Sequence, residues 1–157
     1  MYRYEKLLED AKKDLKIADH MINITYKLVN DPKMLLSITH RLLNTLTNIM
    51  TSILLYERHY KKIPKFNETF DSIFNLFKAR CERRYNIDKE YLQIIQEIKN
   101  IINEHKKSPI VFSKENKLII CSDDYRLKKI SIENIKKYIN KIKLFHNEAE
   151  RMVKING

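Results

Sequence analysis

Residues 34–56 read MLLSITHRLLNTLTNIMTSILLY, and Arg41 is the only charged side chain among them. Apolar residues recur there at spacings of three and four, and they cover most of the circumference of a helix. The stretch follows Asn30-Asp31-Pro32, which supplies a cap residue and a proline for the first helical turn. The pattern predicts a long, mostly buried helix over residues 32–62, against which the rest of the chain packs.

An uncharged polar stripe runs along this predicted helix, around its single arginine. The stripe consists of Ser37, Arg41, Asn44, Asn48 and Thr51. These residues are too polar for a hydrophobic core and too poor in charge for an ordinary wet surface. We expect the stripe to make polar contacts inside a helix bundle, or to face a ligand groove or the second copy in a homodimer. Such a helix is also too polar for lipid, so no membrane-spanning segment is predicted.

The remaining chain predicts four more helices and one hairpin. One-sided apolar spacing indicates helices over residues 2–28, 67–84, 86–106 and 131–155. Before the last of them, β-branched runs at 110–113 and 117–121 flank Lys114-Glu115-Asn116, which is typical of a hairpin. The predicted fold is therefore all-α, a five-helix bundle with a small β-hairpin before the last helix.

We expect a single domain over residues 1–157. Within it we distinguish a four-helix core at 1–107, a hairpin insertion at 108–124 and a basic C-terminal helix at 131–155. A chain of 157 residues buries enough apolar surface to fold without a metal or a disulfide. Cys81 and Cys121 match no zinc or redox spacing, and the first residues are charged throughout. We therefore expect reduced thiols, no signal peptide and a cytoplasmic protein.

Charge is unevenly distributed along the chain. The formal net charge is +11, and seven cations stand against one anion, Glu133, between Tyr125 and Phe145. The cations are Arg126, Lys128, Lys129, Lys136, Lys137, Lys141 and Lys143. Clustered cations gain free energy by releasing counterions from a phosphate backbone, which favours a polyanionic partner. The alternative is a lysine-rich surface that only keeps a prokaryotic protein soluble, and RNA, DNA and an acidic protein are all open as partners.

Basic residues also stand beside tyrosine at five places. These are Tyr2-Arg3-Tyr4, His59-Tyr60-Lys61-Lys62, Arg83-Arg84-Tyr85, Tyr125-Arg126 and Lys136-Lys137-Tyr138. RNA-binding surfaces combine cations for the phosphates with aromatic faces for unpaired bases. The same pattern arises when a tyrosine at a helix end buries its ring and exposes its hydroxyl to water. The five places form one binding surface only if they lie on a shared face of the folded protein. We predict Arg83, Arg84 and Tyr85 as additional contacts to nucleic acid.

Residues 99–105, KNIINEH, resemble the motif of HEPN domains, in which an Arg and a polar residue precede a His by a few residues. Lys99 stands where that family has its Arg, and His105 matches its His. The resemblance covers about residues 2–107. It implies an all-helical, often dimeric bundle and a metal-independent ribonuclease whose pair polarises the ribose hydroxyl and the phosphate. Lysine lacks the planar fork with which arginine holds phosphate, so we expect a non-catalytic relative.

We therefore predict a non-enzymatic protein that binds RNA or a ribonucleoprotein surface through its basic C-terminal helix and hairpin. Two alternatives are a HEPN-type ribonuclease or toxin component that uses Lys99 and His105, and a helical scaffold that binds a protein through the polar stripe. No cofactor is expected, since phosphate loops need more than the single glycine of this chain. His146 and Glu150, four residues apart on one helix, favour an ion pair or simple exposure over a metal site.

Overall fold

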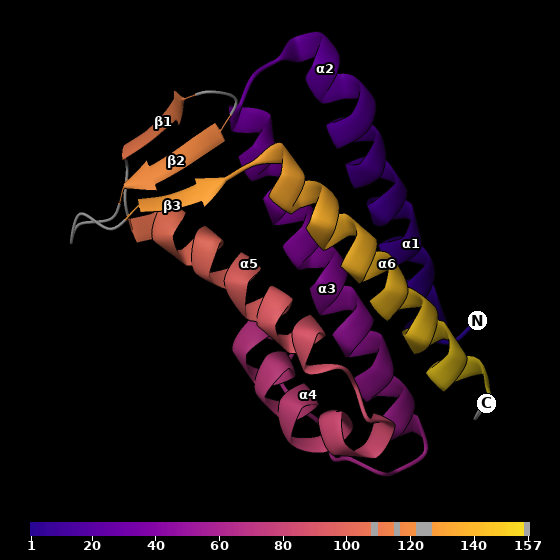
Figure 1. Cartoon of the computed structure of the whole chain (residues 1–157). Coiled ribbons are helices and arrows are strands. Elements are labelled where there is room, and N and C mark those ends of the chain that lie inside the picture. The colour runs from indigo at the N-terminus through magenta and orange to yellow at the C-terminus, as the bar shows by residue number, and fades with distance from the viewer. Residues whose placement is uncertain (108–109, 115–116, 122–126, 156–157) are drawn as a thin grey trace.

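The central helix is α3 (Lys33–His59), as the apolar stretch predicts. The computed structural model describes residues 1–107, 110–114, 117–121 and 127–155, except for the side chains of 81–83, 110–113 and 154–155. Figure 1 shows α1 (Arg3–His20) and α6 (Ile132–Ile155) on one side of α3, and α4 (Phe70–Tyr85) and α5 (Lys89–Lys107) on the other. Each of these four helices packs against α3. The predicted all-α bundle of five helices is confirmed.

Four uncharged polar residues of α3 are buried, and hydrogen bonds within the bundle satisfy them. The hydroxyls of Thr39, Thr45 and Thr51 donate to the carbonyl oxygen four residues earlier, at 2.7, 3.0 and 2.7 Å. The Ser52 hydroxyl instead donates to the Tyr4 carbonyl oxygen on α1, at 2.6 Å. Buried polar groups that are satisfied in this way do not weaken the core.

The first helix is continuous through three segments: α1, the π-helical turn η1 (Met21–Thr25) and α2 (Tyr26–Val29). Its buried face includes Ala11 and Ala18, which are fully buried, and their small side chains let neighbouring helices approach closely. The helix ends at Asn30, whose φ of 52° lies in the left-handed region. Asn86 and Lys61 take the same conformation after α4 and α3, so asparagine and lysine fill helix-end positions that glycine usually occupies.

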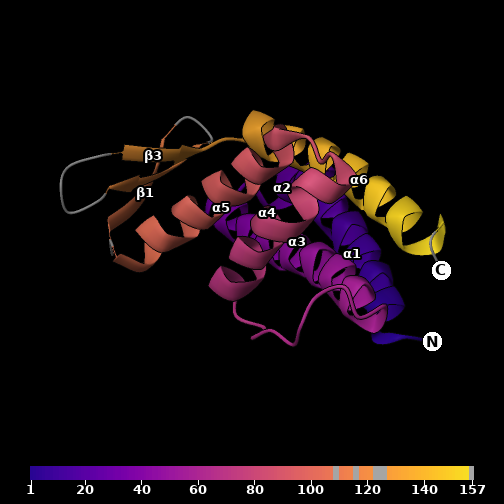
Figure 2. The ribbon, with the colours of Figure 1, turned by 90° about the horizontal axis from the view of Figure 1, so that it is seen from below.

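A small antiparallel sheet stands at the end of the bundle where α3 begins (Figure 1). Its strands are β1 (Ile110–Lys114), β2 (Lys117–Cys121) and β3 (Leu127–Ile130), in the order β1-β2-β3. The predicted hairpin is confirmed as β1 and β2, whereas β3 was not predicted, because two lysines in four residues hide its strand pattern. Leu118, Ile120 and Ile130 are buried, and β2 contacts α3 and α5. Figure 2 shows the sheet projecting beyond α5.

The last helix, α6, begins at a cap that the sequence predicted. The Asn134 N–H donates to the Ser131 hydroxyl at 3.2 Å, which satisfies one of the open donors of the first turn. From there α6 runs to the end of the bundle where both chain termini lie, away from the sheet (Figure 1). Among the described residues, no helix is long and apolar enough to cross a membrane.

Candidate nucleic-acid interface

Two of the predicted cations lie side by side on β3 but point to opposite faces of the sheet. Lys128 is paired with Ile120 and Lys129 with Ile119, and neighbouring residues of a strand alternate between faces. Both lysines are exposed because β3 is an edge strand. Lys129 shares its face with Lys117, which is paired in turn with Lys114. The cationic surface therefore wraps around the edge of the sheet.

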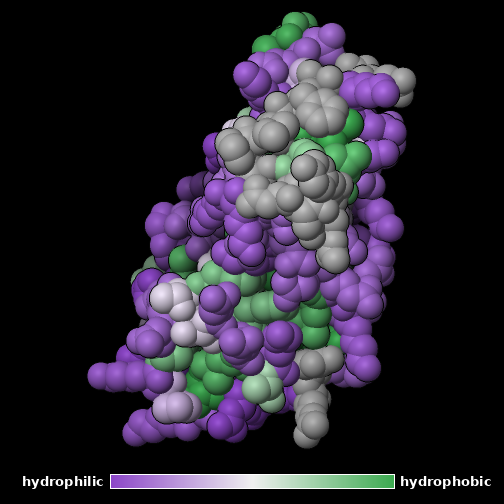
Figure 3. Space-filling model, turned by 90° about the vertical axis from the view of Figure 1, so that its left-hand side faces the viewer, coloured by the Kyte–Doolittle hydropathy of each residue, from purple (hydrophilic) through white to green (hydrophobic). Residues whose placement is uncertain are grey.

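Figure 3 shows mostly hydrophilic side chains around this sheet end, with some apolar atoms among them, and a larger apolar area lower down, below the sheet. The two predicted lysines in the first turns of α6, Lys136 and Lys137, are exposed. In the described part of the chain neither makes an ion pair. Only Ser131 separates the end of β3 from the start of α6, so these lysines lie within two helical turns of the end of β3.

The two later lysines of α6 are held by carboxylates on opposite sides of the helix. Lys141 Nζ lies 2.9 Å from Glu90 Oε2 on α5, and Lys143 Nζ lies 3.2 Å from Asp19 Oδ2 on α1. Both side chains are part-exposed, and ion pairs of this kind contribute about 0–1 kcal/mol. A phosphate can compete for such lysines, but they are less available than Lys136 and Lys137.

Of the remaining predicted contacts, the two whose side chains the structure describes, Arg84 and Tyr85, do not join this surface. Arg126 lies outside the described residues, and so does the side chain of Arg83. Arg84 Nη1 lies 2.8 Å from Glu57 Oε2, and the Tyr85 hydroxyl donates to the other oxygen of Glu57. Glu57 is only 1% exposed and belongs to the C-terminal end of α3, away from the sheet. Arg84 and Tyr85 therefore hold α4 against α3 around a buried carboxylate.

Lys99 and His105 contact different helices. Lys99 Nζ lies 4.8 Å from the centre of the Phe70 ring on α4, whereas the His105 ring lies 6.3 Å from that of His40 on α3. Burial, helped by the nearby His105 and Lys106, lowers the pKa of His40. The two side chains are about 9 Å apart along the axis of α5, so they do not meet within one copy of the chain. The resemblance to HEPN domains stays a prediction.

The polar stripe of α3 divides into inward and outward parts. Arg41 Nη1 lies 3.1 Å from Asp14 Oδ1 on α1, and Thr51 is buried. Asn48 is half-buried, while Ser37 and Asn44 are exposed. Arg41 and Thr51 thus make the polar contacts within the bundle that we expected, and Ser37 and Asn44 are the members still open to a partner.

A cluster of rings at the end opposite the sheet was not predicted as a site. Two of the five basic and tyrosine-containing segments, residues 2–4 and 59–62, meet there. The Tyr2 and Tyr4 rings stack at 5.2 Å and 9°, and His59 lies 4.7 Å from Tyr2. Tyr56 lies 5.3 Å from Tyr4 and 5.0 Å from Tyr60. We call Tyr2, Tyr4, Tyr56, His59 and Tyr60 the aromatic end; their separation in the sequence concealed it.

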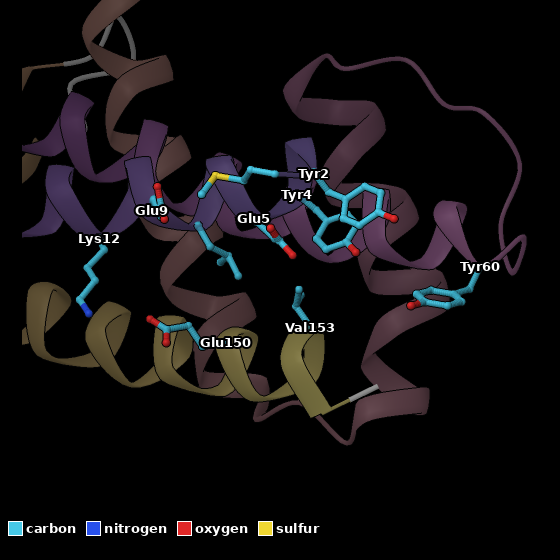
Figure 4. Close-up of a pocket in the computed structure, with 10 residues that line it drawn as sticks. Tyr2, Tyr4, Glu5, Glu9, Lys12, Tyr60, Glu150 and Val153 are labelled. Atoms are coloured by element: carbon cyan, nitrogen blue, oxygen red, sulfur yellow. The ribbon is translucent and has the colours of Figure 1, made fainter. Parts of the chain in front are cut away.

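The aromatic end borders two clefts of opposite charge. The larger, which we call the acidic cleft, measures about 620 Å³ and lies between α1 and α6. Figure 4 shows Glu5 and Glu9 of α1 and Glu150 of α6 around it, with Lys12 at its far end. The smaller, which we call the basic cleft, measures about 320 Å³ and is lined by Arg3, Leu55, Arg58 and His59. Tyr2 and Tyr4 line both clefts and separate them.

Local contacts set the charges around the two clefts. In the basic cleft Arg3 donates to Glu68 at 2.7 Å and lowers the pKa of that carboxyl. Beside the acidic cleft, burial raises the pKa of Tyr4, with smaller contributions from Tyr60 and Glu5. His146 Nδ1 lies 3.2 Å from Glu150 Oε1, the contact that their spacing predicted. No group of three or more His, Cys, Asp or Glu in the described residues is arranged to hold a metal ion.

Comparisons with known proteins do not assign this chain to a family. No family model matches the chain, and neither a curated protein nor a solved structure matches it.

Proposed function

We propose that this protein binds RNA, free or within a ribonucleoprotein, without catalysing a reaction on it. The observation that carries the proposal is a set of four exposed lysines on β3 and the first turns of α6. We call this set the lysine edge; its members are Lys128, Lys129, Lys136 and Lys137. Each cation that meets a phosphate releases counterions, and the net charge of +11 adds a favourable long-range field.

The lysine edge suits a phosphate backbone rather than a base sequence. Lysine ammonium groups are flexible point charges, and contacts of this type position a nucleic acid without reading its bases. Lys141 and Lys143 extend the surface along the two sides of α6 once their carboxylate partners give way to phosphate. We therefore expect affinity for many RNA sequences and a steep dependence on salt.

Glutamine at all four positions of the lysine edge tests the proposal. The matched control replaces four exposed lysines on other parts of the surface, Lys13, Lys16, Lys27 and Lys89, so that both variants lose the same charge. Binding of a structured RNA is measured across a salt series for both variants and the wild type. The lysine-edge variant should lose about tenfold or more in affinity and show a shallower salt dependence, since each lost phosphate contact removes about 0.7–0.9 from the slope.

The control variant distinguishes the effect of the lysine edge from the effect of net charge. It should retain most of the affinity and the salt slope of the wild type, because its lysines lie on α1, α2 and the start of α5. Equal losses in both variants would mean that only net charge matters. Unchanged binding after substitution of the lysine edge would refute the proposal.

We propose separately that two copies of the chain associate through the open part of the polar stripe. Ser37 and Asn44 are exposed there, and Ile17, 44% exposed, lies one turn beyond the Asp14 that pairs with Arg41. A face of uncharged polar groups beside an exposed isoleucine suits a protein partner better than a phosphate backbone.

A further inference from the structure

We propose that the aromatic end binds an unpaired base of single-stranded RNA, with the base in the acidic cleft and its flanking phosphates along the basic cleft. The inference rests on the proposed function for its class of ligand, but it uses different residues at the opposite end of the bundle. It makes unpaired RNA, rather than duplex RNA, the preferred ligand.

The rings form a supported stacking surface. Tyr2 is 53% exposed and Tyr60 is 43% exposed, whereas Tyr4 and Tyr56 behind them are buried. Tyr2 rests on Tyr4 at 5.2 Å, and Tyr4 meets the edge of Tyr56 at 5.3 Å and 85°. The exposed rings are therefore fixed before a ligand arrives, and every base presents a face that can stack on such rings.

The charges on the two sides of the Tyr2–Tyr4 stack indicate where the base and the phosphates of a nucleotide would bind. Glu5 and Glu9 repel phosphate from the acidic cleft, whose volume of about 620 Å³ is in the range of small-molecule sites. On the other side Arg58 and His59 line the basic cleft, and exposed Lys61 and Lys62 follow them in the chain. Phosphates belong on that side, and the base belongs between Tyr2, Tyr60 and the carboxylates.

The carboxylates also predict which bases bind. Ionised Glu5 and Glu9 only accept hydrogen bonds, and Glu150 already contacts His146. Cytosine, adenine and guanine carry an exocyclic amino group that donates to a carboxylate, whereas the only ring donor of uracil, its N3–H, lies between two carbonyl oxygens that repel a carboxylate. We therefore expect oligocytidine to bind more tightly than oligouridine.

Three strands of equal length and charge test the inference: oligocytidine, oligouridine and an abasic ribose-phosphate strand. Affinities are measured for the wild type, for the double variant Tyr2→Leu/Tyr60→Leu, and for Tyr2→Phe/Tyr60→Phe as the control that keeps both rings. Since both tyrosines are part-exposed, thermal unfolding should show that all three proteins are folded. The Leu variant should bind oligocytidine about tenfold more weakly and the abasic strand as before, and the Phe variant should resemble the wild type.

The remaining outcomes separate this inference from the proposed function. Wild-type affinity of the Leu variant for oligocytidine, or an equal loss for the abasic strand, would overturn the inference. Equal wild-type affinities for oligocytidine and oligouridine, or a preference for oligocytidine that Glu5→Gln does not change, would show that the base does not bind in the acidic cleft. On strands long enough to reach both ends of the bundle, the lysine-edge variant should weaken binding of all three; if it does not, the proposed function fails while the aromatic site stands. A wild type that binds none of the strands refutes both.

Discussion

Glu57 shows how one residue decides the packing of two helices. It is the only buried carboxylate among the described residues, and a buried charge is costly unless it is paired. Arg84 and Tyr85, at the end of α4, supply the pairing. The sequence placed Arg84 and Tyr85 among basic and tyrosine-containing segments, which suggested RNA contacts. Their structural role became visible only with Glu57 beside them.

Replacement of Arg84 by methionine should therefore destabilise the protein. We expect a loss of about 2 kcal/mol in the free energy of unfolding, below the roughly 3–5 kcal/mol of a wholly buried pair, because the Arg84 side chain is 42% exposed. Urea unfolding measures it. Arg80→Met, at an exposed position of the same helix, is the control and should change stability by less than about 0.5 kcal/mol. Equal effects of the two substitutions would contradict this role for Arg84.

At the scale of elements, two tyrosines join α5 and α6. The Tyr91 hydroxyl donates to Glu148 at 3.1 Å, and the Tyr138 hydroxyl donates to Glu97 at 3.0 Å. Burial, together with Glu148, raises the pKa of Tyr91 to about 12, and burial together with Glu97 raises the pKa of Tyr138 further. The folded state therefore keeps both protons at a pH where an unfolded tyrosine, with a pKa near 10, loses them.

The free energy of unfolding should accordingly fall as the pH rises through this interval. The contribution of a raised pKa is complete below about pH 10, the unfolded value, and is lost as the pH approaches and passes the folded value. Tyr91→Phe/Tyr138→Phe should be less stable than the wild type near neutral pH, by about 1–3 kcal/mol for two hydrogen bonds, yet lose less stability above pH 10. Urea unfolding over a pH series tests this. Parallel pH profiles of variant and wild type would rule it out.

At the scale of the whole molecule, the two candidate nucleic-acid sites lie at opposite ends of the bundle. α3 alone, with 27 residues, spans about 40 Å between them. The lysine edge lies at the sheet end and the aromatic end lies near the termini, so a short strand occupies one site at a time. The open part of the polar stripe, Ser37 and Asn44, lies along α3 between them.

Association of two copies is the prediction that belongs to this scale. Sedimentation should give the mass of two chains, and the result should change little with salt because the stripe has almost no charge. Ser37→Glu/Asn44→Glu places like charges in the interface and should give single chains, whereas Asn140→Glu/Asn147→Glu, at two exposed positions of α6 with the same spacing, should not. A single-chain mass for the wild type at all concentrations would disprove the association.

The sequence by itself determined the helices of this protein and the first two strands. Helix periodicity and caps are local, so the apolar stretch of α3, the Ser131 cap and the β-branched runs could be interpreted residue by residue. The lysine edge was also predictable, because its members are close in the sequence. The strand β3 was missed because two of its four residues are lysines, and the apolar residues that it pairs with, Leu118 and Ile120, belong to β2.

Only the tertiary structure decided which distant residues meet. Glu57 with Arg84, Arg41 with Asp14, and residues 2–4 with 59–60 are each brought together by helix packing. The same packing gave Lys141 and Lys143 partners on different helices, whereas the spacing along α5 alone separates Lys99 from His105. Spacing along a helix specifies the side on which a residue lies, but not the neighbour that covers it. That neighbour depends on the burial of apolar surface over the whole bundle.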